Sequence, residues 1–317
     1  LRIIPVIVRV YETAERAQST ELNKNTHDRI KCDKTVETKG LFMANNINAE
    51  QIKLVFFDID ETLYVKDKAY VPPSVYTAIR KLKENGIVPG IATGRARGVF
   101  PRVINELIEQ ENIDMMVTIN GQHNSYQGKV IERHPIAIAK IERLIEFFEQ
   151  HRIIYAFISN DRIAVSGITP EMQAALNPIT TDYVVDKQHY RQHEVYQMLA
   201  FYDASQDAQI QASGVLGEDL KVLRWHEYSV DVLEDAGSKA RGIDTIARHL
   251  GYTAANVMAF GDGINDREMI AHVGLGVAMG NAIPELKRVA QYVTSDIEDD
   301  GILNALVALG MIDGFER

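Results

Sequence analysis

Two aspartates, Asp58 and Asp60, follow a short apolar run, and their type and spacing could hold a metal ion. The run, Leu54 to Phe57, is rich in Val and Phe and ends abruptly in charge. It predicts a buried central strand of a parallel sheet, and ligands of open α/β sheets bind at the carboxyl ends of such strands. Alternation along the strand would turn both carboxylates the same way, and two like charges held together need a cation. We therefore predict a metal-assisted reaction at this strand end.

Other polar residues stand where further strands end or helices begin: Thr93, Lys239, Asp262, Asn265 and Asp266. Phosphoryl transfer requires a divalent cation, donors around the developing charge, an in-line nucleophile and an acid for the leaving group. Asp58 and Asp262 could supply the carboxylates that Mg2+ prefers, with Thr93 and Lys239 as donors. A carboxylate can also act as a nucleophile, and Asp60 would then be placed to protonate the leaving oxygen and later to activate water.

The elements that would position these residues alternate between strand and helix from Lys53 onward, which is typical of a doubly wound sheet. Pro72-Pro73-Ser74 opens a predicted helix that runs to about Glu84. A second helix is expected over roughly 97–110. Strands are predicted over 54–57, 87–92, 115–119, 256–260, 275–278 and 292–293.

The pattern changes between residues 123 and 233, which hold short strand pairs and an amphipathic helix over 138–151. This is enough chain for a core of its own. We predict an α/β fold in which a Rossmann-like, doubly wound, mostly parallel core (51–122 and 234–317) carries an inserted α/β cap domain (123–233). Within the insertion, we interpret Trp225 as a packing or surface residue.

Composition and charge narrow the class of protein. The chain has 317 residues, a net charge of −10 and one cysteine, Cys32. The acidic balance argues against nucleic acid or an anionic membrane as the main partner. The cysteine count excludes a disulfide framework and fits a reducing compartment, and no apolar stretch approaches the ~20 residues of a membrane span. We expect a cytoplasmic enzyme.

Residues 1–50 differ from the rest, since the stretch from Thr13 to Asn48 is polar and lacks sustained periodicity. We expect an N-terminal extension that is poorly ordered. Met43 would itself make a reasonable start, so residues 1–42 are interpreted as lying outside the catalytic fold; an arm that packs on the domain is the alternative.

Four segments, DIDET, IATGR, GSKARG and GDGINDREM, together resemble the motifs of the haloacid-dehalogenase superfamily of phosphatases, in particular its Cof-type, subfamily IIB hydrolases. The resemblance covers roughly residues 51–317. It implies that Asp58 is the nucleophile, Asp60 the general acid and base, and that Mg2+ is held by Asp58, Asp262 and the backbone carbonyl of Asp60. From the resemblance and from their neighbours in the sequence, we expect phosphate to be bound by Thr93, Gly94, Arg95, Lys239 and Asn265. Asp266, Asn120 and Gly121 are expected to support the site.

Glu61 departs from the family pattern, which usually has glycine at this position. Its charge could tune metal affinity or substrate charge. The expected substrate is a small phosphorylated molecule, with sugar phosphates first and phosphorylated cofactors next. A phosphomutase or phosphotransferase, and a non-catalytic regulator that binds a phosphometabolite, remain open, as do the substrate itself and the oligomeric state.

Overall fold

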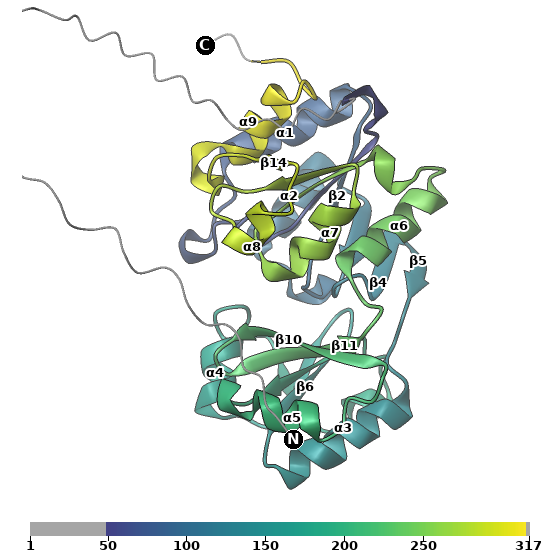
Figure 1. Cartoon of the computed structure of the whole chain (residues 1–317), viewed down its shortest axis with the longest axis vertical. Coiled ribbons are helices and arrows are strands. Elements are labelled where there is room, and N and C mark those ends of the chain that lie inside the picture. The colour runs from purple at the N-terminus through teal and green to yellow at the C-terminus, as the bar shows by residue number, and fades with distance from the viewer. Residues whose placement is uncertain (1–48, 315–317) are drawn as a thin grey trace, which may run out of the picture. The chain divides into compact units, whose positions relative to one another are not determined.

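The computed structural model describes residues 49–314, which form two β-sheets with associated helices (Figure 1). The predicted extension, residues 1–50, lies almost wholly outside this range. Within it, no helix combines the length and apolar character that crossing a membrane requires. The strands of the larger sheet are, in spatial order, β14 (Tyr292–Val293), β13 (Leu275–Ala278), β12 (Val257–Gly261), β1 (Leu54–Phe57), β2 (Val88–Ala92), β3 (Met115–Thr118), β4 (His123–Tyr126) and β5 (Lys129–Arg133).

Strand β1 lies inside this sheet and pairs in parallel with β12 on one side and β2 on the other. All four of its residues are buried, as expected for an uninterrupted apolar strand covered on both faces. The strands from β14 to β3 run parallel. The predicted Rossmann-like sheet is confirmed, and the carboxyl ends of β1, β2 and β12 meet at one edge.

The helices of this part are α1 (Pro73–Glu84), α2 (Arg102–Glu111), α6 (Lys239–His249), α7 (Arg267–His272), α8 (Pro284–Lys287) and α9 (Gly301–Ala308). The predicted helix over 97–110 was wrong at its start. A 3-10 turn over Arg97–Val99 precedes α2, and Pro101 separates the two. Proline has no N–H to donate and restricts the preceding residue, so a helix begins after it more readily than it continues through it.

The second sheet has the order β10 (Leu220–His226), β11 (Ser229–Glu234), β9 (Gln197–Phe201), β6 (Ile154–Ile158), β7 (Ile163–Val165) and β8 (Val184–Val185). Its helices are α3 (Ile138–Gln150), α4 (Pro170–Leu176) and α5 (Asp207–Ala212). Helices α3 and α5 lie along one face (Figure 1), where Leu144, Phe148 and Ile210 join a buried apolar cluster with Val230 and Val232.

The hairpin of β4 and β5 corrects one expectation. We predicted that the inserted domain begins at residue 123, but β4 pairs antiparallel with β3 and extends the larger sheet. The reason is a tight turn, in which Ile119, Asn120 and Gly121 all have positive φ, so that the chain folds back on β3. The second sheet therefore begins with β6.

Candidate active site

Asp58 is the first residue after β1, and its backbone N–H donates to the Phe260 carbonyl of β12 at 3.0 Å. Ile59 is buried, and its carbonyl accepts from the backbone of Thr62, Leu63 and Tyr64 in a tight turn. This turn brings Asp58 and Asp60 to the same cavity, as the alternation predicted.

Glu61 lies in this turn with φ of 55°, a left-handed conformation that explains why glycine suits the position. Its carboxylate accepts from the backbone N–H of Lys66 at 3.1 Å, and its carbonyl accepts from Asn281. The side chain thus closes the loop that follows the turn, a role that the sequence did not indicate.

Lys239 is the first residue of α6, which Ser238 caps through a hydrogen bond from Arg241 N to its hydroxyl. Lys239 is completely buried. Its Nζ donates to Asp58 Oδ1 and to Asp266 Oδ1, both at 2.6 Å. Burial disfavours the charge, but the two carboxylates outweigh it and hold the pKa of Lys239 above its ordinary value.

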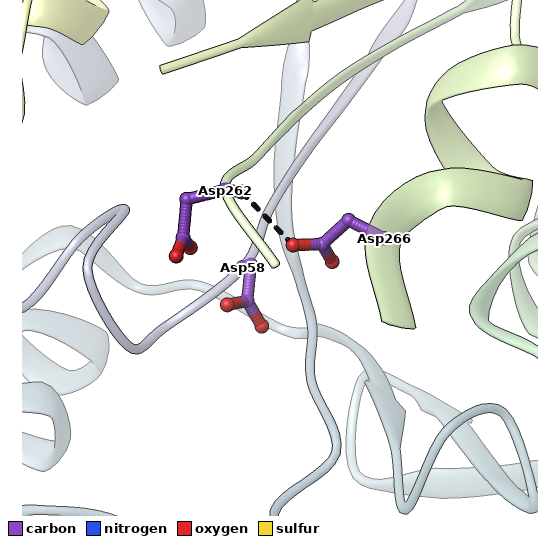
Figure 2. A group of neighbouring side chains, drawn as sticks. All are labelled: Asp58, Asp262 and Asp266. Atoms are coloured by element: carbon purple, nitrogen blue, oxygen red, sulfur yellow. Dashed lines mark hydrogen bonds between the residues drawn. The ribbon is translucent and has the colours of Figure 1, made fainter. Parts of the chain in front are cut away.

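Three carboxylates, of Asp58, Asp262 and Asp266, converge with oxygen atoms within 4.8 Å of one another (Figure 2). Asp266 is already satisfied, because Oδ1 binds Lys239 and Oδ2 accepts from the backbone of Asp262 and Gly263 at 3.0 Å. Asp58 and Asp262 are thus the two carboxylates of this cluster best placed to hold a cation.

The electrostatics of the cluster fit a divalent cation. Burial raises the pKa of Asp58 to about 7 even though Lys239 opposes the shift. Burial, together with the charges of Asp58 and Asp266, raises the pKa of Asp262 to about 9. Carboxylates that repel each other to this extent are stabilised by a positive ion, and Mg2+ takes one or two carboxylates with water and phosphate oxygens.

Asp60 is held by Arg95 rather than by the cluster. The guanidinium donates from Nε to Asp60 Oδ2 at 2.7 Å and from Nη2 to Oδ1 at 2.6 Å. Burial alone would raise the pKa of Asp60, but this bidentate pair outweighs it and lowers the pKa. Arg95 Nη1 binds the carbonyls of Val99 and Ile179. Arg95 lines the cavity, but its guanidinium is committed to these partners.

The expected phosphate-binding residues lie beside the cluster. Thr93, at the end of β2, is buried and lines the cavity. Gly94 leaves room for two amides, since a Cβ there would be 3.2 Å from Asn120 Oδ1 and 3.4 Å from Asn265 Nδ2. Gly121 also needs its small size, because a Cβ would lie 2.1 Å from the Ser238 carbonyl oxygen.

A cavity of about 490 Å³ extends from these loops to the second sheet. Its lining from the second sheet includes residues that we had not selected from the sequence: Gln197, Leu199, Leu223, Trp225 and Asp231. Trp225 packs against a buried apolar cluster, as we interpreted it, and it also lines the cavity. The one signal for Asp231 is a charged residue between two valines in a predicted strand.

A family model described as haloacid dehalogenase-like hydrolase matches residues 55–306. The chain belongs to this family. Among solved structures, the haloacid dehalogenase subclass IIB sugar phosphatase BT4131 is 30% identical, with a TM-score of 0.74 over 82% of this chain and 100% of that one.

Relatives of this haloacid dehalogenase-like hydrolase carry phosphatase names. A Bacillus subtilis protein named "Putative phosphatase YkrA" is 36% identical over 262 residues, which are 82% of this chain and 98% of that protein. A Streptococcus pyogenes protein named "Putative bifunctional phosphatase/peptidyl-prolyl cis-trans isomerase" is 35% identical over 266 residues. These are 84% of this chain but 55% of the streptococcal protein, so the chain spans about half of that relative.

Proposed function

We propose that this protein is a Mg2+-dependent phosphatase that hydrolyses a small phosphomonoester through an aspartyl-phosphate on Asp58. The observation that carries the proposal is the convergence of Asp58 and Asp262 beside a cavity that both residues line, with Lys239 bound to Asp58. Membership in a family of hydrolases with phosphatase-named relatives supports the reaction class. The name of BT4131 makes sugar phosphates the first substrates to test.

Asp58 is suited to be the nucleophile. Lys239 binds its Oδ1 and leaves Oδ2 for attack on phosphorus. In the first step the Asp58 oxygen forms a bond to phosphorus while the bond to the leaving oxygen breaks, and Asp60 gives its proton to that oxygen. In the second step water attacks phosphorus, Asp60 takes the water's proton, and phosphate leaves with Asp58 restored.

Asp60 needs a way to hold a proton in the first step, because Arg95 keeps it ionised in this structure. We infer that the dianionic phosphate of the substrate competes for Arg95. With the guanidinium drawn away, burial would raise the pKa of Asp60 and let it act as an acid. The contact between Arg95 and Asp60 would thus reconcile the acid role of Asp60 with phosphate binding by Arg95.

The remaining residues would bind the phosphate or the metal ion, or hold these binding residues in place. Thr93, Gly94, Lys239 and Asn265 would surround the phosphoryl oxygens with donors. Asp266 would orient Lys239, and Asn120 with Gly121 would fix the loop that enters the insertion. Mg2+, held by Asp58, Asp262 and the Asp60 carbonyl, would neutralise charge on the phosphate. The second sheet and its helices would act as the cap that excludes bulk water and selects the leaving group.

Turnover of p-nitrophenyl phosphate, measured with and without Mg2+, tests this function. The expected result is Mg2+-dependent release of nitrophenol that Asp58→Asn abolishes. Asp114→Asn, which alters an exposed carboxylate just before β3, is the matched control and should keep full activity. Equal turnover by Asp58→Asn would refute the assigned nucleophile. Phosphate transfer to an added alcohol instead of water would indicate a phosphotransferase, and binding without turnover would indicate a regulator.

A further inference from the structure

Asp231 carries a carboxylate on the second sheet, where its cross-strand neighbours are apolar. It lies on β11 directly opposite Leu199 of β9 and Leu223 of β10, and residues paired across strands share one face. Its neighbours Val230 and Val232 turn to the other face and join the buried cluster beneath. The strand thus places one acidic side chain among leucines on the face that lines the cavity.

This carboxylate is incompletely satisfied. Among the described residues it accepts one hydrogen bond of good geometry, from Asn120 Nδ2 to Oδ2 at 3.3 Å, whereas a carboxylate can accept about four. Burial raises the pKa of Asp231 to about 7, although Trp225 and Asn120 both act to lower it. An acidic group in so apolar a place costs free energy unless a partner reaches it.

A buried donor that lacks a well-formed hydrogen bond lies beside this acceptor. Trp225 occupies a β-bulge between Arg224 and His226, an irregularity that re-aims side chains. Trp225 lines the cavity, and its buried Nε1 approaches Asp231 closely enough to lower the pKa of that carboxyl, but makes no hydrogen bond of good geometry to any described residue. The cavity wall therefore offers an acceptor and a donor next to each other, which is the pattern that a hydroxyl group satisfies, because it donates and accepts at once.

The nearby cation does not fill this role. Arg224 also lines the cavity, but its guanidinium donates to Asp207 at 2.9 Å and 2.6 Å and to backbone carbonyls. Among the residues that the structure describes, no arginine binds Asp231 in the bidentate way in which Arg95 binds Asp60. Its open hydrogen-bonding capacity faces the cavity.

Asp231 and Trp225 lie where the leaving group of a bound phosphate ester would extend. One carboxamide, that of Asn120, separates Asp231 from the phosphate-binding loops, since Nδ2 binds Asp231 while Oδ1 accepts from Asn265 at 3.3 Å and lies beside Gly94. A substrate with its phosphorus at Asp58 would therefore extend past Asn120 toward the pair.

We propose that Asp231 and Trp225 form a hydroxyl-binding site that selects phosphomonoesters with a hydroxylated leaving group. The proposal rests on the phosphatase function proposed above and assigns to Asp231 and Trp225 the recognition of a hydroxyl on the leaving group. Leaving groups without hydrogen-bond donors lose these contacts, and those with a carboxylate at this place face repulsion from Asp231.

The test compares three six-carbon probes: sorbitol 6-phosphate, which has hydroxyls along the chain, hexyl phosphate, which has none, and 6-phosphogluconate, which ends in a carboxylate. The native protein should favour sorbitol 6-phosphate. Asp231→Leu should lower kcat/KM for it by about 10- to 100-fold, the value of a hydrogen bond to a charged group, with hexyl phosphate changed by less than about twofold. Trp225→Phe should act in the same direction, and Asp231→Asn should relax the rejection of 6-phosphogluconate.

Asp219→Asn is the matched control, since it removes an exposed carboxylate on the cap side that pairs with Lys140. Equal losses on sorbitol 6-phosphate and hexyl phosphate would overturn the proposal, as would an unchanged ratio. Calorimetric binding of both probes with Mg2+ separates the two claims. If the native protein turns over neither probe but binds sorbitol 6-phosphate more tightly through Asp231, the phosphatase function fails and the hydroxyl site stands.

Discussion

Replacing Lys239 by methionine tests the charge balance of the site. The substitution removes the one ammonium group that donates to both Asp58 and Asp266, each at 2.6 Å, and leaves two buried carboxylates facing each other. Breaking a buried ion pair on one side costs about 3 to 5 kcal/mol. We expect a loss of that size in the free energy of unfolding at pH 8 with the metal chelated.

The loss should shrink in acid. Burial already raises the pKa of Asp58 to about 7, and without Lys239 it should rise further above its unfolded value. The folded state then binds more protons between about pH 4 and that raised value. Stability of the variant therefore falls as pH rises through this window. Urea unfolding followed by circular dichroism at pH 5 and pH 8 measures the difference.

A second substitution separates charge from packing. Adding Asp266→Asn to Lys239→Met removes one of the two opposed charges and should recover a large part of the lost stability. Lys129→Met, at an exposed lysine, controls for loss of charge alone. A loss at pH 8 below about 1 kcal/mol, or no recovery in the double variant, would refute the account of Lys239 as a buried counter-charge.

Three further predictions concern the surrounding loops. Arg95→Met should raise the pKa of Asp60, which must be protonated in the first step, and so move the alkaline limb of the kcat/KM profile on p-nitrophenyl phosphate by about 1 to 3 pH units upward; an unmoved limb would contradict the pairing. Gly98→Ala places a Cβ 2.1 Å from the Asp161 carbonyl oxygen, so kcat/KM should fall about 5- to 100-fold for an overlap cost of ~1–3 kcal/mol, and native kinetics would refute a closed cap in the working enzyme. Glu61→Gly relieves a left-handed φ but loses one hydrogen bond to the loop backbone, so urea unfolding should show a change below about 1 kcal/mol, and a larger change would contradict this balance.

Local patterns predicted the parallel strands of the larger sheet because these strands are short and apolar, and β1 and β12 are each followed directly by an aspartate. β1 and the position of Asp58 follow from that pattern alone. The helix expected over 97–110 failed at Pro101, where one residue outweighed the periodicity of its neighbours. The hairpin after β3 was assigned to the insertion because no local signal tells a strand which sheet it will join.

Long-range contacts set the limits of prediction at the site. The sequence indicates that Arg95 lies near the phosphate but not that it binds Asp60, 35 positions away. Asp231 contacts Asn120 across 111 positions, and its role depends on strand pairing within the second sheet. Such residues can be identified only once the strand register is known, because the register shows which charged residues lie on an apolar face of a sheet.

The placement of β1 between β2 and β12 also affects the order in which the protein can fold during synthesis on the ribosome. Thr62, just after β1, and Asp262, just after β12, are 200 positions apart. At roughly 5 to 20 residues per second, about 10 to 40 s pass before β12 emerges. During that time one edge of β1 has no partner strand, which exposes its backbone to other chains. The second sheet, whose strands are contiguous between residues 154 and 234, can close before the sheet that surrounds it in sequence.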